Sequence, residues 1–447
     1  MTPRQQTIDT QISLESVSDA STMRPILERA LTERFQKSLS IAHLSVPRVY
    51  ARESGVAHIQ YILEMVTSEP ERTERVMLYG EYGNSTGADS GSHSTTKSLY
   101  IKELQLILHL FPFDDRLAGL SGCVVENSGD LWFRWRDFEV PDTGLTFSPE
   151  EILAYRFGKR CVLSGVFRAS AESGSAPVAA VMKLARSRQT AQTLVRQDLL
   201  QELFGEPQHD CFSFPKNLFA DISRGVIITE AVSSPTLYET LSSEEGNVDV
   251  FISAVQRVGV ALRNLHVTSV PSEVPLTRYL ATDETEMLKT NITRTIAVAP
   301  TMRSVLKDTM VDDNPFPMSD SENSSVLSHR DFYDKQLFVT EDRITLIDLD
   351  TVTLADPMLD VANFLAHLNL RRRQGLLSEQ ECCAAKSRFL TGYFGNLAAI
   401  EGEQMTSLRW WYNMSLIRLA TLYALRPKWR RLPEVLIADC RKEGFSH

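Results

Sequence analysis

Long apolar runs are absent from this chain of 447 residues, and no stretch approaches the length that a membrane-spanning helix requires. The opening residues, MTPRQQTIDTQ, are polar, so we expect no signal peptide here. Metal-type cysteine spacing is missing as well, because the six cysteines are scattered without a Cys-x2-Cys pair or a Cys/His pattern suited to zinc. We therefore expect reduced, mostly buried thiols and a cytoplasmic location.

An excess of positive charge is also lacking. The chain has 47 Lys and Arg against 57 Asp and Glu, which gives a net charge of −10. This balance argues against a protein that coats nucleic acid or an anionic membrane, and we expect neither as a partner. With 43% hydrophobic and 23% charged residues, the composition is that of a globular protein with two or three folding units.

No internal repeat divides the chain, but changes in composition predict four segments. These are a flexible N-terminal arm (1–22), an N-terminal α+β accessory domain (23–145), a small lobe with a hinge (146–236) and a large helical lobe (237–447). Apolar residues four apart predict that the accessory domain starts with a helix over 23–35. A Gly/Ser/Thr-rich stretch over 81–98 predicts a surface loop within it.

The second half of the chain predicts a sheet followed by helices. The runs EILAYRF, RCVLSGVFRA and PVAAVMKLA are β-rich and separated by short turns, which predicts an antiparallel meander. SRQTAQTLVRQDLLQELF predicts one main helix, RGVIITEAV predicts a further strand, and the pattern beyond residue 237 is mainly helical. This order indicates an α+β fold with two lobes, and small ligands commonly bind between such lobes.

The most informative segment is SHRDFYDKQLFVTEDRITLIDLD. Asp331 is followed five residues later by Gln336, and a β-like run then leads to Asp348. Phosphoryl transfer needs a carboxylate near the acceptor hydroxyl, oxygen ligands for Mg²⁺ and positive charge on the nucleotide phosphates. A loop with Asp331 and Gln336 that faces a strand end with Asp348 would supply the oxygen groups.

This segment resembles the catalytic loop and metal-binding segment of the aminoglycoside phosphotransferase/choline kinase-like family, whose members are relatives of protein kinases. The family pattern is His-x-Asp-x4-Asn, a hydrophobic strand with an Asp, and then Asp-Pro-x2-Asp, which stands here as residues 356–360. The resemblance covers about residues 147–447. It implies a two-lobed protein-kinase-like fold with a small antiparallel β lobe and a large helical lobe, preceded here by the accessory domain.

The resemblance implies roles for individual residues. Asp331 would be the catalytic base or orient the acceptor, Gln336 and Asp348 would bind Mg²⁺, and Lys183 would hold the α- and β-phosphates of the nucleotide. A carboxylate on the main helix would brace Lys183. The residues expected in the remaining roles are Glu202 as this brace with Asp198 as its rival, Gly158 over the phosphates, and Glu230 and Val232 at the adenine.

The implied activity is that of a small-molecule kinase, which transfers the γ-phosphate of ATP or GTP to a hydroxyl of an amino sugar, sugar or amino alcohol. Two departures motivate an alternative, a nucleotide-binding regulator or pseudokinase: Gln336 replaces the usual Asn, and the phosphate turn has a single glycine. Twelve acidic and three basic residues in 311–360 would favour a cationic acceptor. For Asp350, a second metal contact and a solvated surface position both remain open.

Three other features are interpreted as structural. The basic run Arg371–Arg373 is expected at a solvated helix end. Trp410 and Trp411 are expected in the core because apolar residues follow them at helical spacing. For the neighbouring pair Cys382 and Cys383, we expect one buried and one exposed thiol.

Overall fold

The computed structural model describes residues 13–52, 55–68, 71–83, 98–125, 133–141, 143–169, 176–205, 211–244, 246–307, 309, 325–396, 400 and 402–441. Most of the predicted surface loop over 81–98, and residues 1–12 of the predicted arm, lie outside these ranges. Within them, no helix combines the length and the apolar character needed to cross a membrane. Helices and strands are both abundant, so the predicted α+β class is confirmed.

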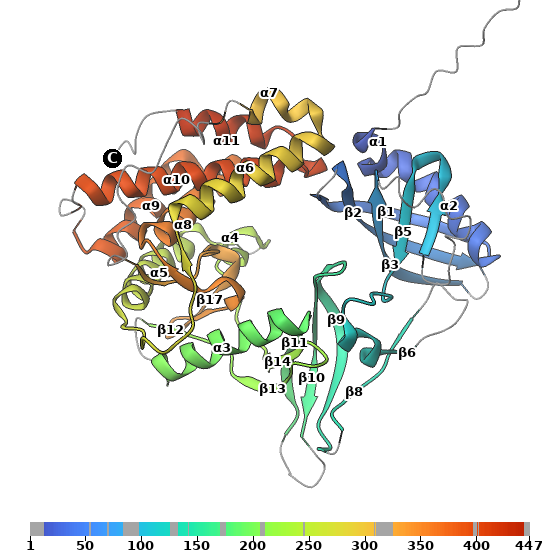
Figure 1. Cartoon of the computed structure of the whole chain (residues 1–447), viewed down its shortest axis with the longest axis horizontal. Helices are drawn as coiled ribbons and strands as arrows, with labels where there is room; N and C mark the ends of the chain where they lie inside the picture. Colours follow the sequence, from blue (N-terminus) through green and yellow to red (C-terminus); the bar gives the residue numbers. More distant parts are fainter. Residues whose placement is uncertain are drawn as a thin grey trace, which may run out of the picture.

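The N-terminal part is a five-stranded antiparallel sheet covered by helices (Figure 1). In sequence order its strands are β1 (Leu39–Ala51), β2 (Ala57–Ser68), β3 (Glu71–Tyr82), β4 (Ser98–Ile101) and β5 (Leu106–Leu110). The helix α2 (Ala20–Phe35) buries Met23, Leu27 and Leu31, as the four-residue spacing predicts. The first helix, α1 (Leu14–Ser18), shows that the predicted arm is too long. Its Val17 is buried, and the Val17 carbonyl accepts a hydrogen bond from the Tyr61 hydroxyl at 2.6 Å.

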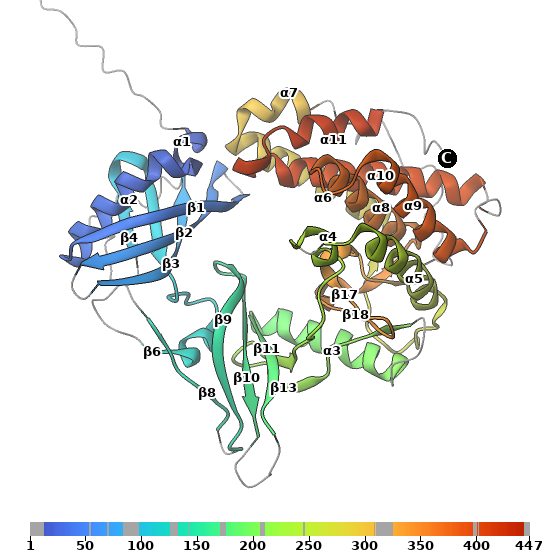
Figure 2. The same cartoon turned by 180° about the vertical axis from the view of Figure 1, so that it is seen from behind.

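A second, six-stranded sheet has the order β13-β14-β11-β10-β9-β8. Its strands are β8 (Phe138–Glu139), β9 (Thr146–Arg156), β10 (Arg160–Arg168), β11 (Val178–Ala185), β13 (Asn217–Asp221) and β14 (Val226–Glu230). Alternate residues of β10 are buried, which is the pattern of a strand with one face on a core. The helix α3 (Ser187–Phe204) lies beside this sheet, so the expected meander and main helix are both present (Figure 2).

The boundary between these two parts differs from the expected one at 145/146. Strand β8 pairs with β9, so it belongs to the six-stranded sheet. Phe111, Leu120 and Phe138 are buried in the same apolar cluster as residues of β9, β10 and β11. Residues 111–125 and 133–140 therefore pack on the small-lobe sheet, because their apolar side chains are buried in its core.

The remaining part is mainly helical. Its longer helices are α5 (Val248–Val267), α6 (Ala281–Val298), α8 (Met358–Arg373), α9 (Glu379–Phe394), α10 (Gly402–Tyr423) and α11 (Leu432–Arg441). Helices α5 and α9 approach closely where Gly259 faces Gly392, since a Cβ on Gly392 would lie 2.1 Å from the Gln256 carbonyl oxygen. Trp410 and Trp411 are 3% and 1% exposed and lie in the core, as expected.

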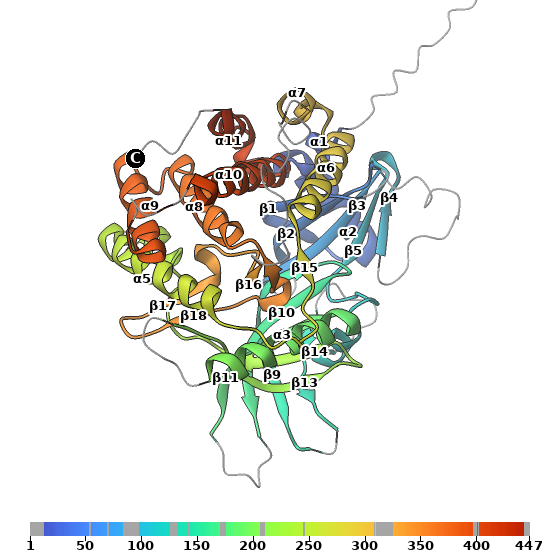
Figure 3. The ribbon, with the colours of Figure 1, turned by 60° about the vertical axis from the view of Figure 1, so that its left-hand side comes forward.

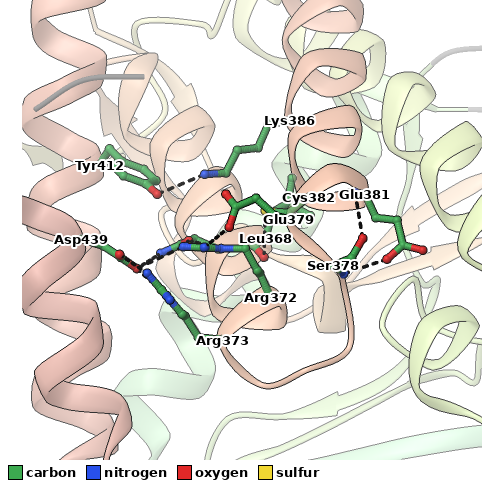
Figure 4. A network of polar contacts seen from close by, with 11 residues as sticks. Leu368, Arg372, Arg373, Ser378, Glu379, Glu381, Cys382, Lys386, Tyr412 and Asp439 are labelled. Atoms are coloured by element: carbon green, nitrogen blue, oxygen red, sulfur yellow. Dashed lines mark hydrogen bonds and ion pairs between the residues drawn. The ribbon is translucent and has the colours of Figure 1, made fainter. Parts of the chain in front are cut away.

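The basic run at the end of α8 is not a solvated helix end, so that expectation is wrong. The Arg371 side chain is 2% exposed and donates two hydrogen bonds to Asp334, at 2.6 and 2.7 Å. Figure 4 shows that Arg372 and Arg373 converge on Asp439 of α11, which accepts a bond from Arg373 Nε at 2.8 Å. The run instead ties α8 to the loop before it and to the last helix.

The three parts are in contact with one another. The N-terminal sheet lies beside α6 and the end of α10, and the six-stranded sheet lies beneath both (Figure 3). Val298 from the end of α6 and Leu425 after α10 are buried in the apolar core of the N-terminal sheet. Ring stacking joins the N-terminal sheet to the turn between β9 and β10.

Candidate active site

The predicted catalytic loop follows β16 (Val326–Ser328) and is held by a buried carboxylate. Asp360, on the first turn of α8, accepts backbone N–H bonds from His329 at 2.6 Å and Arg330 at 2.7 Å. His329 is fully buried, and its Nε2 donates to the Ile347 carbonyl at 2.9 Å. His329 and Asp360 thus fix the loop through a buried network of hydrogen bonds.

Ile347 links the two halves of the motif. Its carbonyl is bonded to His329, and its N–H donates to the Gln336 carbonyl at 3.0 Å. The next residue, Asp348, has a φ of +58°, a left-handed conformation that is uncommon for residues other than glycine. Such backbone conformations cluster at functional sites, where the surrounding contacts hold them in place.

Asp331 is a loop carboxylate with no partner among the residues that the structure describes. It is half-buried, and no hydrogen bond or ion pair engages its side chain within the described ranges. Burial, reinforced by Asp331, Asp334 and Asp348, raises the pKa of Tyr333. Asp331 and Asp348 therefore lie near the same phenol group.

Two cations meet at Asp348. Lys183 Nζ, on β11, lies 2.9 Å from Asp348 Oδ1, although the two residues are 165 positions apart in the sequence. Arg160 Nη1, at the start of β10, lies 3.2 Å from Asp348 Oδ2. Burial alone would raise the pKa of Asp348, but Lys183 and Arg160 outweigh it, and the pKa is strongly lowered. The carboxylate is thus ionised at neutral pH.

Asp350 is the second partner of Lys183. Its Oδ2 lies 2.6 Å from Lys183 Nζ, and its Oδ1 accepts a bond from the Thr193 hydroxyl at 2.8 Å. Burial alone would lower the pKa of Lys183. Asp348 and Asp350 outweigh burial and raise this pKa, so the amine stays charged. Asp350 is thus part of an ion-pair network, whereas sequence reasoning left it between a metal contact and a surface position.

The predicted brace of Lys183 is not on α3. Glu202 and Asp198 are both exposed, and Asp198 accepts a bond from Asn217 Nδ2 at 3.3 Å. The phase of the helix explains the difference: Thr193 and Gln197 are four apart on the buried face, and positions 198 and 202 point away from it. The prediction that Glu202 or Asp198 pairs with Lys183 is therefore wrong for this arrangement.

The turn that was expected to cover the phosphates is held by the segment before the sheet. The Gly158 N–H donates to Asp114 Oδ2 at 2.6 Å, and the Gly158 carbonyl accepts from Arg186 Nη2 at 2.8 Å. Gly158 has a φ of +66°, and a Cβ there would meet the Arg116 side chain at 3.0 Å. In this arrangement the Gly158 amide cannot also donate to a phosphate. The side chains of Lys159 and Arg160 are the cationic groups that the turn offers.

An aromatic contact holds the same turn. The Phe157 ring stacks on His109 of β5, with centroids 4.3 Å apart, and on Tyr79 of β3, with centroids 5.2 Å apart. Two points of the turn are therefore fixed by residues that precede the predicted small lobe. A turn with a single glycine is thus made rigid by neighbouring residues rather than by its own sequence.

The hinge residues are placed at the end of β14. The Glu230 N–H donates to the Lys216 carbonyl at 3.0 Å, so this amide is already occupied. Val232 lies two residues further on, and no backbone hydrogen bond of Val232 is seen in the described part of the chain. Contacts of Glu230 and Val232 with an adenine remain a prediction.

The donor set fits magnesium bound together with a nucleotide. Across the described ranges, no group of three or more His, Cys, Asp or Glu side chains could hold a metal ion by itself. Mg²⁺ usually takes one or two protein carboxylates and completes its shell with water and phosphate oxygens. Asp348, kept ionised by its neighbours, and the Gln336 amide oxygen are hard oxygen ligands of this kind.

Ion pairs reduce the free acidity on which the expectation of a cationic acceptor rests. Asp334 is paired with Arg371, and Asp348 and Asp350 are paired with Lys183 and Arg160. Three of the eight described acidic residues in 311–360 are thus neutralised by ion pairs inside the protein. The acidic residues at positions 312–322 lie outside the described ranges.

A known protein family matches the part of the chain that contains this motif. Residues 252–394, which include the catalytic loop and Asp348, match the model of the phosphotransferase enzyme family. This match confirms the predicted resemblance of the segment to phosphotransferase enzymes. No curated protein matches the chain in sequence.

Several solved structures are similar to about two thirds of the chain. A spectinomycin phosphotransferase in complex with ADP and spectinomycin is 14% identical with a TM-score of 0.44, over 66% of this chain and 88% of that one. The macrolide 2'-phosphotransferase of Brachybacterium faecium is 16% identical with a TM-score of 0.39, over 67% and 93%. The choline kinase of Cryptosporidium parvum is 10% identical with a TM-score of 0.42, over 68% and 90%.

Sequence reasoning missed three residues of this site. Arg160 directly follows the Phe157-Gly158-Lys159 turn, and two consecutive cations after a glycine turn were the available signal. Thr193 and Asp114 gave no comparable signal, because their roles depend on which side chains face them in the folded chain.

Proposed function

We propose that this protein is a Mg²⁺-dependent kinase that transfers the γ-phosphate of ATP or GTP to a hydroxyl of a small polar acceptor. The contact of Lys183 with Asp348, which is 2.9 Å long, is the observation that supports it most. Asp331 and Asp348 both act on Tyr333, and no partner of the Asp331 side chain is found among the described residues. The match to a phosphotransferase family over 252–394 supports the same class of reaction. Within that class, a sugar, amino sugar or amino alcohol would suit the site, since each offers a hydroxyl to Asp331.

The residues of this chain divide the work of phosphoryl transfer. Asp331 would accept the proton of the acceptor hydroxyl and orient its oxygen toward the phosphate. Lys183 and Arg160 would neutralise the negative charge of the nucleotide phosphates. Gln336 and Asp348 would hold Mg²⁺, which when bound supplies further positive charge to the phosphates. Phosphoryl transfer depends mainly on such positioning and charge stabilisation.

A pseudokinase or nucleotide-binding regulator is the second candidate. Gln336 in place of Asn and the occupied amide of Gly158 favour it, because both change groups that would contact the metal or the phosphates. The two candidates differ in whether nucleotide binding leads to turnover. If the wild-type protein, with Asp331 intact, binds nucleotide but shows no turnover, the regulator is favoured.

Thermal unfolding with ATP, GTP and Mg²⁺ in each combination tests nucleotide binding. A ligand at one hundred times its Kd stabilises a protein by about 2.7 kcal/mol, which is readily measured. The matched variant is Asp348→Asn, since asparagine tolerates the left-handed backbone of this position and removes only the charge. Mg²⁺-dependent stabilisation that is lost in Asp348→Asn supports the proposal, and no shift with either nucleotide contradicts it.

Turnover is then tested with a screen of hydroxyl acceptors, measured as ADP or GDP release. Asp331→Asn should abolish acceptor-dependent turnover and leave nucleotide-induced stabilisation unchanged, because Asp331 contacts the acceptor and has no partner of its own in the described structure. An Asp331→Asn variant with wild-type kcat would rule out the assigned role.

A further inference from the structure

A cluster of arginines surrounds Tyr50 where the three parts of the chain meet. The Arg48 Nη1 atom of β1 lies 3.4 Å from the Tyr50 hydroxyl oxygen. The guanidinium carbon of Arg156, at the end of β9, lies 4.2 Å from the centre of the Tyr50 ring, and that of Arg426, just after α10, lies 5.8 Å from it. We refer to Tyr50, Arg48, Arg156 and Arg426 as the arginine cluster.

The arginine cluster has no acidic counterpart in the part of the chain that the structure describes. None of its three guanidinium groups forms an ion pair there, in contrast to Arg371, which binds Asp334 through two bonds. Like charges that are held together without a counter-charge repel one another. A bound anion would remove this repulsion, and Arg is the side chain best suited to bind an oxyanion through paired N–H groups.

Two buried polar atoms, one in the cluster and one beside it, lack a hydrogen-bond partner among the described residues. Within that part of the chain, Arg156 Nε is buried without an acceptor, and the hydroxyl of Tyr79, whose side chain is 1% exposed, is buried without a partner. Burial raises the pKa of Tyr79, and both Tyr50 and Arg156 affect it, so the three residues are near neighbours. Most buried polar groups in native proteins have partners, and an orphaned donor often marks a missing ligand or water.

The pKa shifts of Tyr50 and of nearby Lys159 agree with an excess of positive charge in the cluster. Burial would raise the pKa of Tyr50, yet the three arginines lower it. Burial, followed by Arg156 and Arg52, lowers the pKa of Lys159 to about 8. The positive potential therefore extends from Tyr50 to the turn that carries Lys159.

Glu81, an acidic residue that influences Tyr79, has other partners. Glu81 lies 3.2 Å from His58 Nε2 and 3.7 Å from His109 Nε2, and these contacts lower its pKa. Arg52 Nε donates to His58 Nδ1 at 3.3 Å. Glu81 therefore interacts with the two histidines, and it does not pair with the arginine cluster.

We propose that the arginine cluster is a binding site for an oxyanion, namely the phosphate group of a small molecule. Each of the four residues is half-buried, so the guanidinium groups are partly desolvated and still reach solvent. The guanidinium groups would donate hydrogen bonds to the anion, and Arg156 Nε and the Tyr79 hydroxyl would donate the remaining ones. The site does not depend on the kinase reaction proposed above, although Arg156 directly precedes the phosphate turn.

Calorimetric titration with inorganic phosphate, at an ionic strength kept constant with chloride, tests the site. The variants Arg156→Gln and Arg426→Gln each remove one cation, and each should weaken phosphate binding at least about tenfold. Lys428→Gln is the matched control, because Lys428 is exposed and lies two residues after Arg426. The control should bind within twofold of the wild type. Wild-type affinity in both arginine variants would overturn the proposal.

Two further measurements distinguish the arginine cluster from the nucleotide site, and an acceptor from an effector. Phosphate should bind equally well to Asp348→Asn, and its affinity should change less than threefold in the presence of saturating ATP and Mg²⁺. Displacement of phosphate by nucleotide would overturn the proposal, because the arginines would then belong to the nucleotide site. A sugar phosphate that binds at the cluster supports the proposal whether or not it is phosphorylated: turnover identifies the anion as part of the acceptor, and binding without turnover identifies an effector.

The melting temperature excludes a purely structural role. In anion-free buffer of low ionic strength, Arg156→Gln should unfold at or above the wild-type temperature, because it relieves repulsion between cations. Arg426→Gln also loses the 3.0 Å bond from Arg426 Nη1 to the Pro47 carbonyl, so the melting temperature is compared for Arg156→Gln alone. A lower melting temperature for Arg156→Gln, together with unchanged phosphate binding, would show that Arg156 only supports the fold.

Discussion

Replacement of Asp350 by Asn tests whether this carboxylate positions Lys183. The substitution keeps the size of the side chain, and an asparagine oxygen can still accept the Thr193 hydroxyl bond of 2.8 Å. It removes the negative charge that lies 2.6 Å from Lys183 Nζ. Lys183 would then be held on one side only, by Asp348.

The size of the effect follows from the charges. Two unit charges about 4 Å apart attract each other by about 4 kcal/mol at an effective dielectric constant of about 20. The Asp350 side chain is 31% exposed, so water screens the pair and we take about half of this value, ~2 kcal/mol. Since each ~1.4 kcal/mol is a factor of ten in rate, kcat should fall about 30-fold. Nucleotide affinity should change little, because Lys183 remains charged and close to Asp348.

The assay is steady-state release of ADP with an acceptor found by screening, together with nucleotide affinity from calorimetry. Thr193→Val is the matched control, since it removes the hydroxyl that holds Asp350 and leaves its charge in place. We expect a smaller loss of kcat, of about three- to tenfold, for Thr193→Val. Wild-type kcat in Asp350→Asn, or a loss that appears entirely in nucleotide affinity, would refute the reasoning.

Three further predictions concern stability. Asp114→Ala leaves the Gly158 N–H unpaired, which should destabilise the fold by about 1–3 kcal/mol in urea unfolding and weaken nucleotide binding; unchanged values for both would show that the contact is dispensable. Arg371→Met leaves Asp334 buried without its ion-pair partner and should lower the free energy of unfolding by about 3–5 kcal/mol. Asp334→Leu in the same chain should recover most of this loss. A double variant that is no more stable than Arg371→Met would argue against this. Lys159 has a pKa of about 8 in the folded state against 10.5 in the unfolded state, so the unfolded state binds more protons between these two pH values. The free energy of unfolding should therefore rise with pH in this range, relative to that of Lys159→Gln. Parallel pH profiles of the two proteins would contradict the assignment.

The local parts of the site could be predicted from the sequence. The spacing of His329, Asp331 and Asp348 reflects contacts made within one short segment, such as the bond from His329 to the Ile347 carbonyl. Lys183 was identified through the family resemblance, which implies a phosphate-binding lysine on this strand. The pairing of Lys183 with Asp350 could not be predicted, because it depends on how β11 packs against a segment more than 150 residues later.

The error in the helix phase has a simple physical cause. A helical register is fixed by which face is buried, and α3 contains few strongly apolar residues to indicate that face: Thr190, Thr193 and Gln197 are among its buried side chains. A search for a carboxylate on this helix therefore selected Glu202 and Asp198 by residue type. The apolar spacing of α2, in contrast, made its buried face evident.

The contact of the N-terminal sheet with Val298 and Leu425 bears on how the protein unfolds. Because residues from the N-terminal and C-terminal thirds share one apolar core, and Phe157 inserts between rings of the N-terminal sheet, no part can open without exposing the surface of another. We expect a single cooperative melting transition rather than separate ones for each part. A chain trimmed to residues 146–447 would expose these apolar faces to water and would be prone to aggregation.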